Sequence, residues 1–226
     1  MKEVRDPQGG LLLKQGGYLD TVAYLNSVRA FLERENNFLE EQVTDNVTVT
    51  HDGVHFKNYL SDRVVYCTGT HQNSLFSWLP IRPLKGEVLL ISTDRTDKMI
   101  INRGVYVVPH IKGQWRVGAT YNFGDLEPTT TTKSREELLA RLGLLIHFPF
   151  KVIGQQWGLR PTTPDRRPIL GQHPENPRVW TMNGMGTKGV SLAPYFADVL
   201  IHSMENGGSL NKEVDIERYK SLYWTS

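Results

Sequence analysis

The length, composition and charge of this chain exclude several classes of protein. A chain of 226 residues can bury a sizeable core and could hold one large domain or two small ones. Its 26 basic and 24 acidic residues are interspersed and give a formal charge of +2, so no nucleic-acid-binding face is expected. One cysteine excludes an intrachain disulfide, and we find no run apolar enough for a membrane span or a signal peptide. We therefore expect a globular protein of the cytoplasm that binds neither nucleic acid nor membrane.

The first elements are a predicted strand and a predicted helix. Residues 9–18 form an apolar stretch between glycines, which favours one strand. Asp20 or Thr21 can cap a helix that Asn36 and Asn37 end. Apolar residues recur inside it at helical spacing, at Tyr24, Leu25, Val28, Phe31 and Leu32.

A hairpin and a buried strand are predicted next. Residues 47–50 and 54–57 alternate around an Asp-Gly turn, which indicates a hairpin. His51 and His55 flank this turn, so their four-residue spacing does not predict zinc binding. Residues 63–69 are typical of a buried strand that ends in a glycine turn, with Cys67 as a small buried residue and not a nucleophile.

The second half of the chain combines further strands with two helices. Strands are predicted within residues 80–93, at 105–109 and 114–118, the last two joined by a turn at Lys112-Gly113, and then at 152–159 and 178–182. Ser134 and Glu137 form a capping box for a helix that continues to Leu145. A final helix over about 186–205 ends at Asn206-Gly207-Gly208. This mixture predicts two interleaved layers of structure.

Two segments near the end of the chain carry a family resemblance. Gly158-Leu159-Arg160-Pro161-Thr162-Thr163-Pro164-Asp165, an arginine loop, is followed by Pro168-Ile169-Leu170-Gly171. Then Asn183-Gly184-Met185-Gly186-Thr187-Lys188-Gly189 opens the final helix. This order resembles the C-terminal half of the D-amino-acid oxidase family of flavoenzymes, and weaker similarity runs from about residue 9 to the last helix.

The resemblance implies an α/β (α+β) fold, a partial FAD-binding domain interleaved with an antiparallel substrate-binding sheet. It assigns residues 1–18 to a substrate-domain strand, 19–75 and 151–226 to the FAD domain, and 76–150 to the substrate sheet. The family's N-terminal dinucleotide-binding glycine loop has no match at the start of this chain. We therefore expect the chain alone to bind FAD weakly or not at all, and to form a homo-oligomer or to need a missing N-terminal segment.

Three residues match the family's substrate contacts. Arg160 matches the arginine that grips the substrate carboxylate, although pairing with Asp165 is an alternative. Tyr106 matches a tyrosine whose hydroxyl assists there, with plain packing as the alternative. Lys188 resembles the carboxylate-binding lysine of monomeric sarcosine oxidase, or it is a solvated lysine of the first helical turn.

The expected flavin contacts lie around two glycine turns. Gly184, Gly186 and Gly189 form G-x-G-x-x-G outside a βαβ unit, so the resemblance implies a helix N-terminus at the flavin's pyrimidine edge; a mere tight turn is the alternative. Gly158 stands where sarcosine oxidase carries its covalent cysteine, so FAD should be non-covalent. The full cofactor set is Thr68, Gly69, Gly158, Gly184, Met185, Gly186, Thr187, Lys188 and Gly189.

By resemblance, the function is that of an FAD-dependent oxidoreductase acting on a small amine or amino acid. A hydride leaves the carbon next to nitrogen for the flavin, and water hydrolyses the resulting imine. One alternative is a non-catalytic fragment or partner subunit of such an enzyme. Another is a flavin oxidoreductase that modifies a transfer RNA base, against which the near-neutral charge counts.

Overall fold

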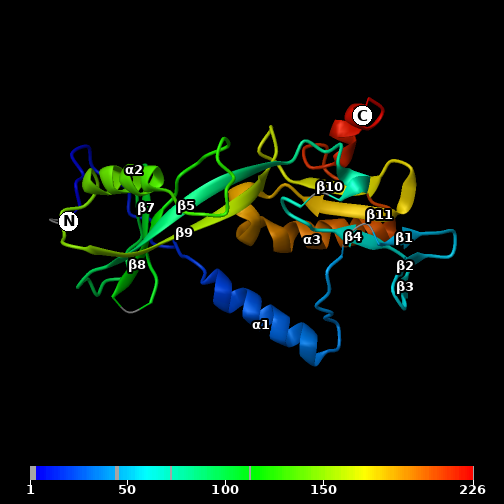
Figure 1. Ribbon diagram of the computed structural model, residues 1–226, viewed down its shortest axis with the longest axis horizontal. Helices are drawn as coiled ribbons and strands as arrows, with labels where there is room; N and C mark the ends of the chain where they lie inside the picture. Colours follow the sequence, from blue (N-terminus) through cyan, green and yellow to red (C-terminus); the bar gives the residue numbers. More distant parts are fainter. Residues whose placement is uncertain (1–3, 44–45, 72, 112, 226) are drawn as a thin grey trace. The chain divides into compact units, whose positions relative to one another are not determined.

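The computed structural model describes residues 4–43, 46–71, 73–111 and 113–225, which form mixed helices and strands (Figure 1). The chain divides into two compact units. The first consists of Met1–Phe38 and Lys85–Leu159, and the second of Leu39–Leu84 and Arg160–Ser226. Two long strands, β5 (Arg82–Ser92) and β9 (Lys151–Thr162), contain two of the points where the chain passes between the units.

The first unit is built on a five-stranded sheet with the order β6-β7-β8-β5-β9. Strands β7 (Tyr106–Pro109) and β8 (Gln114–Gly118) pair antiparallel, as do β8 and β5, which confirms the predicted strands. The short β6 (Ile101–Asn102) was not predicted, and β9 extends beyond the predicted bounds. Lys112 of the predicted turn lies outside the described residues.

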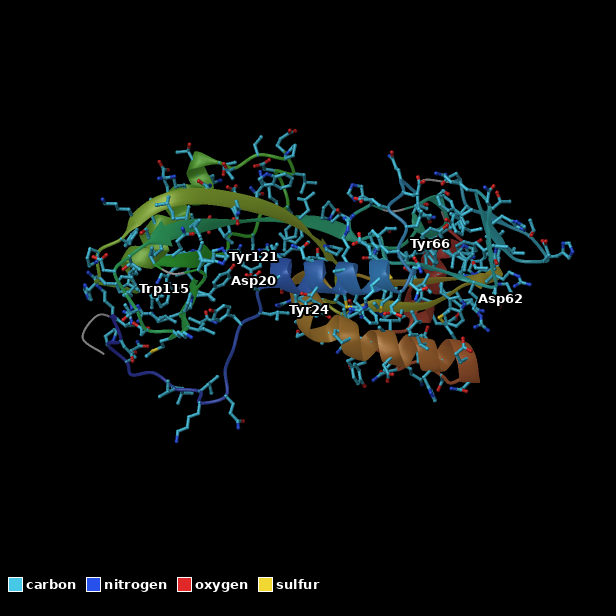
Figure 2. The ribbon with its side chains drawn as sticks, turned by 90° about the horizontal axis from the view of Figure 1, so that it is seen from below. Asp20, Tyr24, Asp62, Tyr66, Trp115 and Tyr121 are labelled. Atoms are coloured by element: carbon cyan, nitrogen blue, oxygen red, sulfur yellow. The ribbon has the colours of Figure 1, made fainter. Side chains whose placement is uncertain are left out.

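Helix α2 (Thr132–Gly143) covers one face of this sheet (Figure 1). Leu138 and Leu142 are fully buried against alternate residues of β5, β7 and β8, among them Leu89, Val107 and Trp115 (Trp115 is labelled in Figure 2). Burial of these side chains is the main stabilising contribution, about 1.5–3 kcal/mol for each.

The predicted cap of α2 is wrong. Thr131, not Ser134, is the N-cap, because its hydroxyl accepts a hydrogen bond from the Ser134 amide. The Glu87 carboxylate accepts from both the amide and the hydroxyl of Thr131, which fixes the start of the helix. Glu137 instead pairs with Arg141 one turn later, and the helix ends at Gly143, before Leu145.

The N-terminal segment confirms one prediction and contradicts another. Helix α1 (Thr21–Arg34) is capped by Asp20, whose side chain accepts from the amides of Val22 and Ala23. Residues 9–18 form no strand: they are exposed, pair with no strand in the described part of the chain, and include a left-handed glycine, Gly9. Apolar composition alone does not make a strand when its backbone groups lack partners. The apolar residues of α1 are not buried either.

The second unit contains the three-stranded sheet β10-β11-β4. Strand β4 (Val64–Tyr66) runs parallel to β11 (Asn176–Asn183), and β10 (Ile169–His173) runs antiparallel to β11. Helix α3 (Gly189–Asn206) follows the short turn η2 (Gly186–Lys188) and ends at the left-handed Gly207, close to the prediction. Its Leu200 joins a core with Leu170, Trp180 and Val214.

Strand β4 is less buried than predicted. Only Tyr66 is buried, since β4 is the edge of its sheet, and Cys67 is exposed, so the expectation of a buried cysteine is wrong. Desolvation of the thiol by neighbouring atoms nevertheless raises the pKa of Cys67.

The remaining elements of the second unit are short. The predicted hairpin is confirmed as β1 (Thr48–Val49) and β2 (Val54–Phe56), and β3 (Tyr59–Ser61) extends it. Single turns complete the unit at η1 (Ser74–Phe76), η3 (Ile216–Tyr219) and α4 (Lys220–Tyr223).

Candidate functional site

The predicted flavin contacts that belong to the second unit, which are all of them except Gly158, lie in the turns that follow the parallel strands β4 and β11. Open α/β sheets bind ligands at this carboxyl edge of their parallel strands. Asn183, only 6% exposed, donates from Nδ2 to the carbonyl of Gly69 at 2.9 Å and accepts at Oδ1 from the amide of Gly184 at 2.8 Å. This side chain therefore joins the turn after β4, which contains Thr68 and Gly69, to the loop before α3. The sequence did not single out Asn183 as a site residue, although it directly precedes the glycines.

Glycine is required by the backbone at the turns of this edge. Gly69, Gly184 and Gly186 have φ values of 63°, 71° and 56°, in the left-handed region. A Cβ on Gly184 would lie 2.6 Å from Cγ2 of Thr163, whereas a Cβ on Gly186 would meet nothing closer than 3.8 Å. Gly189 has ordinary helical angles as the first residue of α3. The loop thus presents bare backbone ahead of a helix N-terminus.

Accessibility increases along the loop from Met185 to Lys188. Met185 is half-buried, while Thr187 and Lys188 are exposed within η2. The carbonyl of Met185 accepts a hydrogen bond from the amide of Lys188 at 3.0 Å, which closes this turn. Lys188 therefore places its cation at the positive end of α3, a position that an anionic ligand would favour.

Arg160 lies in the last part of β9, not in a loop as predicted. β9 continues to Thr162, whose hydroxyl donates to the carbonyl of Arg82 at 2.7 Å. Next to Arg160, the carbonyl of Pro161 would lie 3.9 Å from a Cβ on Gly186. The end of β9 that carries Arg160 therefore adjoins the glycine loop.

The carboxylate of Asp165, which the sequence analysis considered as a partner of Arg160, pairs with Arg218. Its Oδ2 lies 2.8 Å from Nε of Arg218, and its Oδ1 accepts from the Arg167 amide. Desolvation opposes ionisation, but these contacts outweigh it and hold the pKa of Asp165 below its usual value. Arg218 is therefore a structural partner of Asp165.

Tyr106 and Gly158 belong to the first unit. Tyr106 lies opposite Gly118 in the β7–β8 pair, and a Cβ on Gly118 would come within 2.5 Å of the Tyr106 hydroxyl oxygen. The glycine therefore leaves space for the tyrosine ring above the strand. At Gly158 a Cβ would meet nothing within 4 Å, so packing does not require glycine there.

Two buried charges support the sheet of the first unit and were missed by the sequence analysis. Glu87 is 1% exposed and, besides binding Thr131, accepts from Nε2 of Gln155 at 2.6 Å. Its burial disfavours the charge, but these hydrogen bonds hold the pKa of Glu87 below its usual value. Lys85, also 1% exposed, lies 2.9 Å from Asp125. Charged residues alternating with apolar ones along a strand were the available signal.

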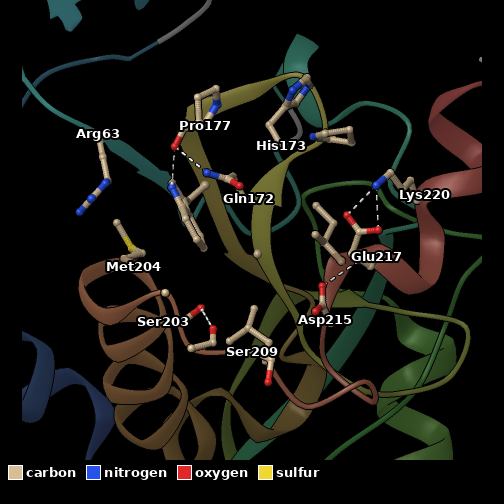
Figure 3. Close-up of a pocket in the computed structure, with 17 residues that line it drawn as sticks. Arg63, Gln172, His173, Pro177, Ser203, Met204, Ser209, Asp215, Glu217 and Lys220 are labelled. Atoms are coloured by element: carbon tan, nitrogen blue, oxygen red, sulfur yellow. Dashed lines mark hydrogen bonds and ion pairs between the residues drawn. The ribbon is translucent and has the colours of Figure 1, made fainter.

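The second unit also contains a cavity of about 650 Å³ that includes none of the predicted site residues (Figure 3). It lies between the end of β10, the C-terminal end of α3 and the turns near Lys220. Its cations are engaged, since Arg63 pairs with Glu205 and Lys220 with Glu217. Within the described residues there is no cluster of three metal-binding side chains, and no helix combines the length and apolar character needed to cross a bilayer.

Related sequences among known proteins include a glycine oxidase and a bifunctional protein of tRNA biosynthesis. The chain is 30% identical over 148 residues to glycine oxidase of Bacillus licheniformis, covering 62% of this chain and 40% of that protein. It is 31% identical over 153 residues to the tRNA 5-methylaminomethyl-2-thiouridine biosynthesis bifunctional protein MnmC of Idiomarina loihiensis, covering 62% of this chain and 25% of that protein. The chain spans less than half the length of these relatives.

Solved structures show the same fold. Iminodiacetate oxidase from Chelativorans sp. BNC1 matches with a TM-score of 0.68 at 21% identity, covering 87% of this chain and 57% of that one. Glycine oxidase from Geobacillus kaustophilus matches with a TM-score of 0.64 at 21% identity, covering 74% and 49%. The predicted combination of helices and sheets is thereby confirmed. The sequence model of the FAD dependent oxidoreductase (DAO) family matches residues 1–203, nearly the whole chain, and the chain therefore belongs to this family.

Proposed function

We propose that the chain provides the flavin-facing and substrate-facing part of an FAD-dependent oxidoreductase that acts on a small amine or amino acid. The observation that supports this most strongly is the meeting of two glycine turns at one edge of the sheet, through the bonds of Asn183 to Gly69 and Gly184. FAD is the cofactor of the family, and when bound it accepts a hydride from the carbon next to the substrate nitrogen.

The described residues fit this cofactor. Gly184 and Gly186 leave the backbone open to a flat ring, because neither carries a Cβ and both have positive φ. The N-terminus of α3 directs backbone amides and a positive dipole toward negative charge there. Gly158 offers no nucleophile, which supports non-covalent binding. Thr68, Met185, Thr187 and Gly189 complete the proposed contacts.

Binding of the substrate carboxylate is assigned to Arg160, with help from Tyr106 and Lys188. A guanidinium can hold a carboxylate bidentately, and the phenol and ammonium can each donate one more hydrogen bond. These residues bind and orient the substrate, so no strong base is needed in the chain's own chemistry. We propose the same division of labour for the chain as a whole, with residues 19–75 and 151–226 toward FAD and 76–150 toward substrate.

We further propose a cytoplasmic location and self-association of the chain. The composition supports the former. The exposed apolar residues of α1, such as Leu25 at 62% and Phe31 at 51%, support the latter, because a second copy would cover them. Light scattering tests this, and a monomer at all concentrations would contradict it.

An absorbance titration with FAD, followed by anaerobic mixing with amines, tests the main proposal. We expect weak binding, seen as a shift of the FAD absorbance bands at high protein concentration, and bleaching of the flavin by at least one substrate among glycine, sarcosine and iminodiacetate, with an unrelated amine-free acid as control. An FAD spectrum that excess protein leaves unchanged would favour the non-catalytic alternative.

A second candidate function is oxidation of a modified transfer RNA base. The 31% identity to the MnmC protein supports it, whereas the near-neutral charge does not. The same anaerobic experiment separates the two: bleaching by transfer RNA but by none of the free amines would favour the nucleic-acid substrate.

A further inference from the structure

The two faces of the sheet in the first unit differ in burial. Residues that alternate toward α2, such as Leu89, Val107 and Val117, are fully buried. Their neighbours on the other face, including Val88, Leu90 and Val108, are only half-buried. Because side chains alternate along strands, Tyr106 belongs to this second, partly open face. A ligand that reaches Tyr106 would therefore lie against it.

Arg116 lies on the same face as Tyr106. In the register of the sheet, Tyr106 opposes Gly118, and Val108 opposes Arg116. Arg116 is thus two residues along β8 from the position beside Tyr106, or about 7 Å along the strand. It is half-buried, and its Nε is buried without a hydrogen-bond partner among the described residues. A buried donor of this kind is costly unless a ligand or water satisfies it.

One histidine and one carboxylate lie near Arg116. His110 directly follows β7 and continues the alternation of Tyr106 and Val108. The nearby carboxylate is that of Asp20, which caps α1 by accepting from two amides. The pKa of Asp20 is held below its usual value, first by the Ala23 amide and in lesser part by the charges of His110 and Arg116. Asp20 is exposed and accepts hydrogen bonds from two amides as the cap of α1, and no hydrogen bond or ion pair between Asp20 and Arg116 is present among the described residues.

We propose that Arg116 is a specificity-determining residue that binds a second carboxylate of the substrate, which selects short dicarboxylic amines or amino acids. This inference rests on the proposed function for the role of Tyr106 at the first carboxylate. Because the two strand positions are only about 7 Å apart, side chains from them can contact two carboxylates separated by a few bonds. The planar guanidinium of Arg116, which has an unsatisfied donor, can bind the second carboxylate, whereas it would repel a cationic substrate side chain.

Calorimetry and ligand-induced shifts in Tm, with glutarate and butyrate as unreactive probes, test this on the full chain in excess FAD. These acids have related carbon chains and differ in the second carboxylate. We expect wild type to prefer glutarate by about tenfold, and Arg116→Gln to lose that preference while binding butyrate as before. Arg116→Lys should retain part of it. Lys133→Gln, an equal charge change at an exposed position of α2, should behave like wild type.

The outcomes are distinct. An unchanged glutarate preference in Arg116→Gln, an equal loss for both acids, or no glutarate binding to wild type would each overturn the assignment. Thermal melting without ligand shows whether each variant is folded. If Arg116→Gln is unfolded, the glutarate preference of Arg116→Lys decides between the outcomes. If glutarate binding depends on Arg116 but no amine bleaches the flavin, then the anion site stands and the proposed oxidation fails.

Discussion

The glycine edge of the second unit and the sheet of the first unit are built in different ways. At the edge, left-handed glycines and one amide side chain, Asn183, shape the backbone, and the charged residue of the loop, Lys188, is exposed. In the sheet, the buried charges Glu87 and Lys85 hold a helix and a loop in place. The first arrangement presents the chain to a ligand, whereas the second supports the scaffold. Mutations in the two regions should therefore separate ligand binding from stability.

Arg160→Ala should give the largest loss of ligand binding with little change in stability. Removing the guanidinium that would pair with a substrate carboxylate should weaken binding of a carboxylate ligand by about 2–5 kcal/mol. The bound FAD and the free energy of unfolding should stay close to wild type. Calorimetric titration with butyrate measures the effect, with Lys212→Ala, an exposed cation of the same unit, as control. Equal affinities for both variants would show that Arg160 is structural.

Gly184→Val should disrupt the glycine edge. A β-branched residue at φ 71° is strained, and its Cβ would overlap Cγ2 of Thr163, so we expect about 2–4 kcal/mol of destabilisation and loss of FAD binding. Gly186→Val should cost less stability, because a Cβ has room there. Urea unfolding and FAD titration check both.

A matched glycine sharpens this test. Gly143, at the end of α2, has no positive φ, and a Cβ added there would meet nothing within 4 Å, so Gly143→Val should bind FAD like wild type. If Gly184→Val also bound FAD normally, the loop would be an ordinary helix start.

Glu87→Gln should lower the free energy of unfolding and leave ligand binding unchanged. An amide offers one acceptor oxygen where the carboxylate uses two, so donors from Thr131 and Gln155 lose partners, at a cost of about 1–3 kcal/mol. The pKa of Glu87 is lowered in the folded protein, so its contribution is present above the usual glutamate pKa and is lost as pH falls through the lowered value.

Urea unfolding at pH 7 and at decreasing pH measures this contribution. The difference in unfolding free energy between wild type and Glu87→Gln should shrink as the solution is acidified below about pH 4. Glu136→Gln, the same change at an exposed position of α2, should unfold at pH 7 like wild type. Loss of FAD binding without loss of stability in Glu87→Gln would contradict the supporting role.

The contrast between the two regions also explains what the sequence could predict. Periodicity and caps located α1, α3 and most strands, because these signals are local. The same signals failed where the outcome depends on a distant partner: residues 9–18 lack a neighbouring strand, α1 buries nothing, and Thr131 replaces Ser134 as cap because Glu87 binds it from another strand. The resemblance supplied the candidate ligand residues, but not Asn183, Glu87 or Arg116, whose roles depend on contacts across the fold.

Lys188→Met should give the smallest effect. Lys188 is exposed, so water and salt screen its charge, and an anionic ligand near α3 should lose less than about 1 kcal/mol of binding energy. The same change removes a cation from a helix N-terminus, which is an unfavourable position, so the unfolding free energy should rise by roughly 0.3–1 kcal/mol. Titrations with butyrate at low and high salt, with Lys212→Met as control, measure the first effect. Because screening grows with ionic strength, the loss should shrink at high salt. An affinity equal to wild type at low salt would make Lys188 a solvated residue without a part in ligand binding.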